Sequence, residues 1–404
     1  MIAGFESRLR GLAEVVVRVG VNLRPGQHLL VAEPYELFGV ARSAAVIVDA
    51  VRAAADAAGG AGVEVIWGDG ARLREFAAQR DWAEFSRFVG AQAQRIGQQI
   101  DRGDALLFLQ GSQPNLLDGI APEAVAELRR IGWERFGPVI QRLVQGATNW
   151  TAAPAPSPGW ASSVFADLPS AQRLAALWET VFASCRIGAE SGEPDAIAAA
   201  ALTAWDDHLR ALAASRDELN ARRRPALRYR GDGTDLTVTL PRDHRWCTAQ
   251  LATTSGHPFV ANLPTEEIFT LPHRDSARGT VRVARPITCA GMATEGIQLT
   301  FRDGVVTGAT ATRNEALLRR LLATDEGASR LGEVAVVLRP TMLARSGRLF
   351  RHPLLDENAS NHLALGDSYA FCLASPDPAA ANRSLIHVDL PIDAQVEWPG
   401  AEPA

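Results

Sequence analysis

The first part of the chain alternates short apolar runs with longer segments of helical periodicity. The apolar runs cover residues 28–32, 63–67 and 105–109, and the clearest helical patterns cover residues 38–58 and 82–100. Short apolar strands that are separated by crossover helices are typical of parallel βαβ units. We therefore expect a parallel sheet whose strands are central and buried on both faces.

The pattern changes twice further along the chain. Residues 122–222 read as mostly helical, with a proline-rich interruption at residues 154–159. After Pro225 the apolar positions become short and alternating, and Asp232-Gly233 and Asp303-Gly304 stand where hairpin turns belong. This pattern of short, alternating segments is typical of mixed or antiparallel sheet.

These patterns predict an α/β protein of two domains. Residues 1–225 would form an N-terminal parallel-sheet βαβ domain with a helical extension, and residues 226–404 a C-terminal mixed or antiparallel α+β domain. A helix over residues 315–323 would be capped by Asn314. The strands expected in the C-terminal domain cover residues 227–230, 236–240, 281–284, 297–301, 334–338 and 385–389.

Composition excludes several classes of protein. The 404 residues carry a formal charge of 41 − 46 = −5, which argues against a protein that coats nucleic acid. All 41 basic residues are arginine, so pyridoxal enzymes, P-loop ATPases and protein kinases, which need a lysine, are excluded. The four cysteines form no CxxC pair, and neither a zinc ribbon nor a redox dithiol is indicated.

The sequence also carries no sign of export or of a membrane partner. The first 20 residues contain charges and lack the continuous apolar run of a signal peptide. No stretch reaches the roughly 18–20 uncharged apolar residues of a membrane span. We expect a cytoplasmic protein with neither a membrane nor a nucleic acid as partner.

Potential metal ligands gather in the last 140 residues, next to apolar strands. They are Glu266, Glu267, Glu333, His362, His387 and Asp389, with Tyr369 close by in the sequence. His387 and Asp389 stand two residues apart in a predicted strand, so they would share one face. Gly332, before Glu333, would let the backbone approach a ligand closely.

Each of these signals is weak alone, because a solvated strand face or a core histidine would look the same. In sum, two histidines, one aspartate and two separated glutamates suffice for a dinuclear site. Such a site holds two ions about 3.5–4 Å apart with at least one bridging carboxylate. Oxygen-rich ligands with imidazole suit zinc, cobalt or manganese.

The same segments resemble the thermophilic-type metalloaminopeptidases, the aminopeptidase T and aminopeptidase S family of leucyl aminopeptidases. The matching segments are NLPTEEIFTLPHR (262–274), LGEVAVV (331–337), DENASNHLALGDSY (356–369) and NRSLIHVD (382–389). Further blocks at residues 19–34, 104–112 and 233–241 extend the resemblance over nearly the whole chain. The resemblance implies a cytosolic homodimer that uses two metal ions to remove N-terminal residues from short peptides.

Carried over motif by motif, the resemblance implies a set of metal ligands in the C-terminal domain. These ligands are Glu267, Glu333, His362, His387 and Asp389. Of the adjacent glutamates we choose Glu267 as the ligand, and Glu266 as the candidate general base or as a residue behind the ligands. Tyr369 would donate a hydrogen bond to the tetrahedral oxyanion, an interaction worth about 3 kcal/mol.

A second hypothesis comes from a different reaction class. His362, His387 and Asp389 alone are a two-histidine, one-carboxylate set, which usually holds non-haem Fe(II) in oxygenases. Some relatives of the family look like ring-opening dioxygenases of hydroxylated pyridines. Glu267 and Glu333 favour the peptidase, because a mononuclear iron site has no use for two further carboxylates.

A third hypothesis is a catalytically weakened member that serves as a scaffold. The segment 370–382 is shorter than is usual in the family, and the strand after Asp389 lacks the family's further hairpin. Pro391 and Pro399 also limit this strand as a central one. Both departures lie near the expected metal site.

Overall fold

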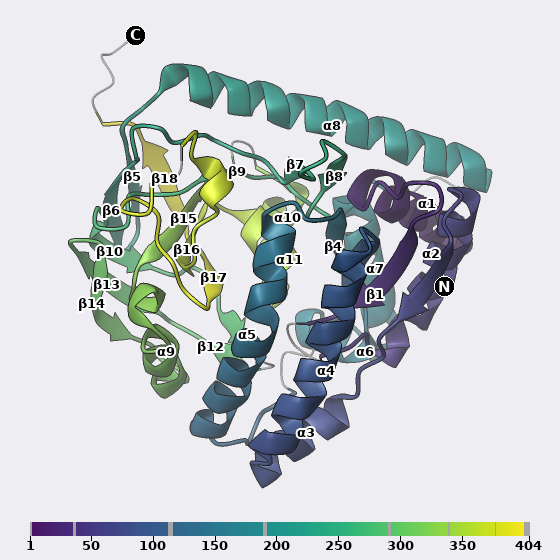
Figure 1. Ribbon diagram of the computed structural model, residues 1–404, viewed down its shortest axis with the longest axis horizontal. Coiled ribbons are helices and arrows are strands. Elements are labelled where there is room, and N and C mark those ends of the chain that lie inside the picture. The colour runs from purple at the N-terminus through teal and green to yellow at the C-terminus, as the bar shows by residue number, and fades with distance from the viewer. Residues whose placement is uncertain are drawn as a thin grey trace.

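The N-terminal half is built on a parallel sheet with the strand order β2-β1-β3-β4 (Figure 1). The computed structural model describes residues 2–34, 38–111, 116–188, 192–289, 292–337, 340–375 and 377–399. The four strands are β1 (His28–Ala32), β2 (Gly62–Val65), β3 (Ala105–Gln110) and β4 (Trp150–Pro154). The predicted α/β fold class, with parallel βαβ units first and antiparallel sheet later, is confirmed.

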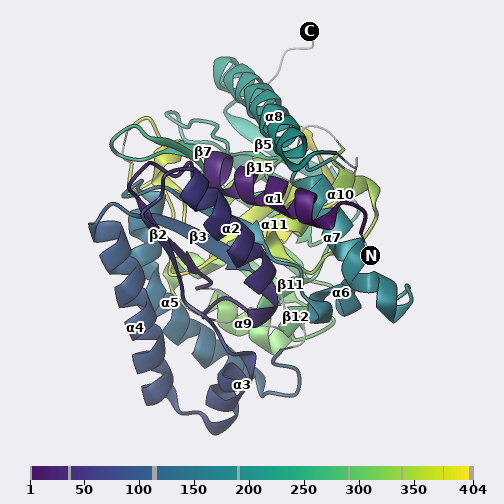
Figure 2. The same ribbon diagram turned by 90° about the vertical axis from the view of Figure 1, so that its right-hand side faces the viewer.

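Eight helices of the described chain accompany this sheet. They are α1 (Phe5–Val15), α2 (Ala45–Ala57), α3 (Gly70–Gln79), α4 (Trp82–Asp101), α5 (Pro122–Val144), α6 (Pro158–Val164), α7 (Ser170–Ser184) and α8 (Pro194–Arg222). Helices α4 and α5 lie side by side, and α8 lies along α1 at the outer edge of the molecule (Figures 1 and 2). None of the helices in the described part of the chain combines the length and apolarity that crossing a membrane requires.

Three details of the secondary structure differ from the sequence-based expectation. Strand β2 lies at the sheet edge, so it is only partly buried, whereas β1 and β3 are buried almost throughout. Strand β4 interrupts the segment that was expected to be mostly helical. Asn314 makes no side-chain cap to its helix, because its amide donates a hydrogen bond to the carbonyl of Ala293 instead.

The C-terminal half contains two larger antiparallel sheets. One has the order β14-β13-β10-β6-β5-β18 and the other the order β17-β16-β15-β9. The strands are β5 (Ala226–Gly231), β6 (Thr234–Thr239), β7 (Gln250–Ala252), β8 (Pro258–Val260), β9 (Ile268–Thr270), β10 (Arg278–Arg282), β11 (Ile287–Cys289), β12 (Met292–Thr294), β13 (Gln298–Arg302), β14 (Val305–Thr310), β15 (Leu331–Val336), β16 (His362–Gly366), β17 (His387–Pro391) and β18 (Ala394–Glu397). The helices are α9 (Glu315–Leu322), α10 (Met342–Arg345) and α11 (Pro353–Asp356).

The two halves share one hydrophobic core, which continues from the parallel sheet into both antiparallel sheets. The backbone also links them, because Ala152 in β4 pairs in parallel with Asn262. The amide of Ala152 donates to the carbonyl of Ala261 at 2.7 Å, and the amide of Leu263 donates to the carbonyl of Ala152 at 2.9 Å. The segment before β9 is therefore fixed against the N-terminal sheet.

Gly332 sits at an irregularity of β15, where the pairing with β16 shifts between Leu331 and Glu333. A Cβ atom at this position would overlap the carbonyl oxygens of Gly366 and Asp367. The group that approaches Gly332 closely is thus the chain's own backbone, whereas the sequence suggested a ligand. The bulge directs the side chain of Glu333, which follows it.

Replacing Gly332 by alanine is expected to lower the free energy of unfolding by about 2 kcal/mol or more, because the added methyl group overlaps backbone atoms. Chemical denaturation measures the change. Gly90→Ala in α4 is the matched control, since an alanine there meets nothing closer than ordinary contact distance and favours the helix. Equal stability of the two variants would contradict this role of Gly332.

Candidate metal centre

The sheet β17-β16-β15-β9 presents the predicted ligands on one face. Glu333 in β15 and Asp389 in β17 both lie opposite Ala364 in β16, so the three residues form one row across the sheet. His362 stands two positions from Ala364, and His387 two positions from Asp389, which places them on the same face.

Glu267 comes from a different direction. It precedes β9, whose pairing with β15 places it at the far edge of the same sheet. Its Oε2 atom lies 2.8 Å from Nε2 of His362. All five predicted ligands thus reach one region of the sheet.

The ligand atoms form two groups that share Glu333. Nε2 of His362 lies 3.4 Å from Oε1 of Glu333, and Nε2 of His387 lies 3.7 Å from its Oε2. Nε2 of His387 also lies 3.5 Å from Oδ1 of Asp389. Glu267, Glu333 and His362 bring their ligand atoms within 4.8 Å of one another, and so do Glu333, His387 and Asp389.

The surroundings of these groups favour cations. Glu267 and Glu333 are buried, and Oε2 of Glu267, although it lies 2.8 Å from Nε2 of His362, has no partner with hydrogen-bonding geometry in the described part of the chain. Among the described residues, no arginine forms an ion pair with either of them or with Asp389. Buried carboxylates in excess over cations are costly unless a metal balances them. The donor set of carboxylate oxygens and imidazole nitrogens fits divalent zinc, cobalt or manganese.

The titration behaviour of the cluster has the same physical origin. Burial raises the pKa of Glu333 above its usual value. Burial would lower the pKa of His387, but its hydrogen bond with Asp389 and the nearby charge of Glu333 raise it to about 10. The negative carboxylates therefore stabilise the charged form of the imidazole of His387. A bound metal ion would instead supply the positive charge that balances the carboxylates.

Glu357 is a member of the site that the sequence did not single out. It is buried in a short 3-10 turn (Glu357–Ala359), and it lines the same pocket as the five predicted ligands. Burial first, and then the charges of Asp389 and Glu267, raise its pKa well above the usual value. The only signal in the sequence was an acidic residue five positions before His362, inside a segment used for the resemblance.

Glu266 lies outside the cluster. Its Oε1 atom accepts a hydrogen bond from Nη2 of Arg186 at 2.6 Å, and its amide donates to Oδ1 of Asn358 at 2.6 Å. Nε2 of His208 is 3.9 Å from its other carboxylate oxygen. Its side chain is thus directed at α8 and the end of α7, while that of the adjacent Glu267 is directed at the ligand cluster.

The ion pair of Arg186 with Glu266 is expected to hold Glu267 in place. Substitution of residues that hold metal ligands in place typically lowers metal affinity 10- to 100-fold. We therefore expect Arg186→Gln to weaken metal binding by about tenfold or more. A titration against a competing chelator measures the affinity. Arg210→Gln removes two exposed ion pairs on α8 and is the control, with no change expected. Equal metal affinity in both variants would contradict the positioning role.

Tyr369 follows β16 and lies beside the cluster. Its ring centroid is 4.7 Å from that of His387 and 5.4 Å from that of Phe371, on which it stacks. Phe269 meets the tyrosine ring edge-on at 5.7 Å. Aromatic packing thus fixes the tyrosine ring at the wall of the ligand pocket.

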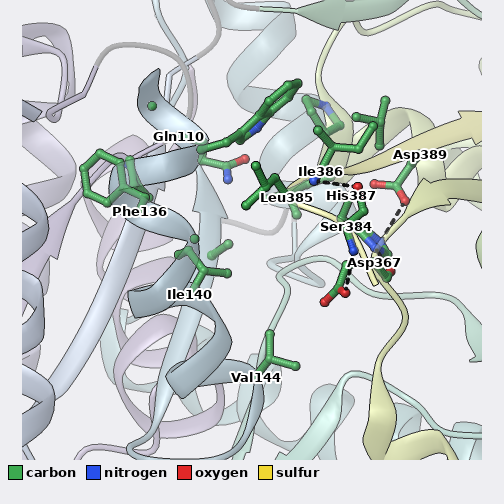
Figure 3. A pocket seen from close by; sticks show the side chains of 18 of the residues that line it. Gln110, Phe136, Ile140, Val144, Asp367, Ser384, Leu385, Ile386, His387 and Asp389 are labelled. Atoms are coloured by element: carbon green, nitrogen blue, oxygen red, sulfur yellow. Dashed lines mark hydrogen bonds and ion pairs between the residues drawn. The ribbon is translucent and has the colours of Figure 1, made fainter. Parts of the chain in front are cut away.

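The ligand pocket adjoins a larger cavity that is lined by residues of both halves. The pocket has a volume of about 70 Å³ and the cavity about 670 Å³, and both are lined by Trp150, Tyr369, His387 and Asp389. The cavity is of the size usual for small-molecule and peptide sites. Figure 3 shows α5 on one side of it and the residues around His387 on the other.

Comparisons with known proteins agree along the whole chain. Residues 5–397 match the family model described as thermophilic metalloprotease (M29). Aminopeptidase T of Thermus thermophilus is 37% identical over 394 residues, which cover 95% of this chain and 92% of that protein. Aminopeptidase AmpS of Bacillus subtilis is 33% identical over 399 residues, with coverages of 96% and 93%.

Solved structures give the same result. Wild-type AmpT from Thermus thermophilus superimposes with a TM-score of 0.85 at 35% identity, over 97% of this chain and 95% of that chain. A 2,5-dihydroxypyridine dioxygenase from Pseudomonas putida has a TM-score of 0.50 at 15% identity, over 98% and 94%, which shows a shared fold alone. The chain therefore belongs to the thermophilic metalloprotease family M29, and it is a metal-dependent peptidase that resembles aminopeptidases along its whole length.

Proposed function

We propose that the chain is an aminopeptidase that hydrolyses N-terminal residues from short peptides at a dinuclear metal site. The observation that carries the proposal is the position of Glu333. Each of its carboxylate oxygens faces a different histidine, so it belongs to both groups of ligand atoms. A carboxylate that bridges two ions is the feature that a dinuclear site requires.

One ion would be held by Glu267, Glu333 and His362, and the other by Glu333, His387 and Asp389. When bound by these residues, such ions would supply a water molecule of strongly lowered pKa as the nucleophile and Lewis acidity for the carbonyl of the bond to be cleaved. Zinc, cobalt and manganese are the candidates. Glu357, next to Asp389, is available as a further ligand.

The protein's own side chains supply the remaining functions. The hydroxyl of Tyr369 would donate a hydrogen bond to the oxyanion as the carbonyl becomes tetrahedral. The surplus of carboxylates suits the ammonium group of a free peptide N-terminus. The role of general base for Glu266 finds no support in its position, since Arg186 holds its carboxylate; we assign it the positioning of Glu267.

The iron dioxygenase is the alternative from another reaction class. It needs His362, His387 and Asp389 around one ion, but within the described ranges the two histidines fall into different groups of ligand atoms. The two glutamates complete these groups instead. This arrangement favours the peptidase.

Metal analysis together with an activity assay tests the proposal. We expect two ions per chain, and release of N-terminal residues from leucine or alanine anilides that stops on chelation and returns with zinc, cobalt or manganese. Full activity in excess chelator after long dialysis would end the proposal. One iron per chain with oxygen uptake on a dihydroxypyridine would favour the dioxygenase. The absence of bound metal would favour the hypothesis of a catalytically weakened scaffold protein.

We also propose that the protein is a cytoplasmic homodimer, as its resemblance to the family implies. Light scattering coupled to size-exclusion chromatography would give the mass of the assembly. A mass of one chain, 43.3 kDa, would contradict the dimer without affecting the proposed chemistry.

A further inference from the structure

The larger cavity follows one face of α5 for most of the helix. Val144, at the C-terminal end of α5, lines both the cavity and the ligand pocket. Toward the N-terminal end of α5, the cavity is lined at intervals of three or four residues by Ile140, Phe136, Gly132 and Arg129. Residues at this spacing share one helix face, of which Figure 3 shows Phe136, Ile140 and Val144. The ring of Phe38 packs on this face at Gly132 and stacks on Phe136, so the helix and Phe38 together form the wall that leads away from the metal centre.

The chemistry of this wall changes at its far end. The wall is apolar from the ligand pocket onward, where it consists of Val144, Ile140 and Phe136. Its far end carries the cation of Arg129. The guanidinium of Arg129 lies over the ring of Trp133, at 4.4 Å from its centroid. Stacking on an aromatic ring fixes the guanidinium plane and limits its freedom.

Arg129 has hydrogen-bonding capacity that the described chain does not use. Its Nε atom, which is closed off from solvent, has no hydrogen-bond partner, and no acidic side chain of the described residues lies within ion-pair distance of the guanidinium group. The two Nη groups are therefore the donors that a ligand in the cavity would meet. The neighbouring Arg130, in contrast, is paired with Glu127 and Glu134. An arginine held in place without a carboxylate, at the edge of a cavity, is a ready site for an external carboxylate.

The length of the wall sets the size of the ligand. Arg129 and Val144 are 15 residues apart, which at 1.5 Å per residue places them about 22 Å apart along the helix axis. An extended peptide covers at most about 3.3–3.6 Å per residue. A chain of about six or seven residues therefore reaches from the ligand pocket to Arg129.

We propose that Arg129 binds the C-terminal carboxylate of peptides of about six or seven residues whose first peptide bond lies at the metal centre. This inference rests on the proposed aminopeptidase function and specifies its substrate by length and by a free C-terminus. The apolar face of α5 would contact the side chains between the two ends. Shorter peptides would not reach Arg129, and amidated peptides would offer it no charge.

Arg351 and Arg383 also line the cavity, and of these two arginines Arg383 is the one to compare with Arg129. Arg383 lies closer in sequence to His387 and would suit a shorter peptide. Its side chain is 59% exposed and already lies 3.9 Å from Oδ1 of Asp367. A carboxylate bound there stays hydrated and gains little. Arg129, buried in part and lacking an acidic partner, is the stronger anchor.

The test compares peptides of two to nine residues that begin with leucine and continue with alanine, each as the free acid and as the C-terminal amide. For the metal-loaded wild type we expect kcat/KM of the free acid to exceed that of the amide by about tenfold at six or seven residues, and to equal it for dipeptides. Arg129→Gln should remove this advantage and leave dipeptides and amides unchanged. Arg135→Gln, an exposed arginine on α5 that contacts Ser86, is the matched control and should behave as wild type.

A binding measurement separates the anchor from the chemistry. A heptapeptide in which a reduced, uncleavable bond replaces the first amide should bind the wild type about tenfold more tightly as the acid than as the amide, and Arg129→Gln should abolish the difference. Loss of the length dependence in Arg383→Gln but not in Arg129→Gln would overturn the assignment, as would an equal effect of Arg129→Gln on all lengths. Binding of the acid through Arg129 without hydrolysis of any peptide would instead refute the proposed function.

Discussion

Replacing Glu333 by glutamine is expected to remove both metal ions and to lower kcat/KM by at least about 10³-fold. A divalent ion contributes several kcal/mol of charge stabilisation in the transition state, and each 1.36 kcal/mol corresponds to a factor of ten in rate. Glutamine keeps the shape of the side chain but loses the charge, and it cannot offer an anionic oxygen to each ion. Because Glu333 is common to both groups of ligand atoms, one substitution affects both sites.

Glu267→Gln is the informative companion variant. Glu267 belongs to only one group of ligand atoms, so this variant is expected to keep one ion, bound by Glu333, His387 and Asp389. Metal analysis after equilibrium dialysis would therefore give about two, one and zero ions per chain for the wild type, Glu267→Gln and Glu333→Gln. Identical metal contents in the two variants would contradict the bridging role of Glu333.

A folding control accompanies both variants. Burial raises the pKa of Glu333, which means that its ionised form is unfavourable in the metal-free protein. The neutral glutamine should thus leave the melting temperature of the metal-free protein unchanged or higher. A lower melting temperature of metal-free Glu333→Gln would indicate a structural role for the carboxylate, and its loss of activity could then not be assigned to the metals.

The strands that carry the fold were largely predictable, because they are buried runs of branched and aromatic residues. Strands β1 and β3 begin where the apolar runs at residues 28–32 and 105–109 begin. Strand β4 was missed because its sequence, WTAAP, is rich in alanine and ends in proline, and neither residue is typical of strands. Its place in the sheet comes from tertiary contacts, with β3 on one side and Asn262 on the other.

The site was predictable where a strand period sets the direction of side chains. The i, i+2 spacing of His387 and Asp389 places both on one face of β17, as expected, while Val388 between them is buried. No strand was expected over residues 362–369, but the chain forms strand β16 there, with Tyr369 three residues beyond the end of the strand. Glu357 could not be found in this way, because it lies on a short turn without periodicity and is brought to the cluster by tertiary packing.

The adjacent glutamates show the remaining limit of the sequence. Nothing in Thr265-Glu266-Glu267 tells which carboxylate faces the ligands, because the direction depends on the partners that each one finds. Arg186, 80 residues earlier in the chain, binds Glu266. His362, 95 residues later, contacts Glu267. Pairings at such separations arise only in the folded chain.

Tyr369→Phe is expected to lower kcat by about 10²- to 10³-fold, with little change in KM and none in metal content. Removal of one hydrogen-bond donor to an oxyanion typically costs about 2.7–4 kcal/mol in the transition state, where the charge develops. Phenylalanine keeps the ring that packs on Phe371 and His387, so the walls of the pocket stay in place. Steady-state kinetics on a leucine anilide would separate the two constants.

Phe371→Leu is the control for the aromatic packing. It removes the ring that stacks on Tyr369 but leaves the tyrosine hydroxyl, so a purely structural role of the aromatic cluster predicts a larger loss of kcat here than in Tyr369→Phe. A hydroxyl that stabilises the oxyanion predicts the opposite order, because the chemical group is lost only in Tyr369→Phe. A drop in kcat with KM nearly constant identifies an interaction made in the transition state rather than in the bound substrate.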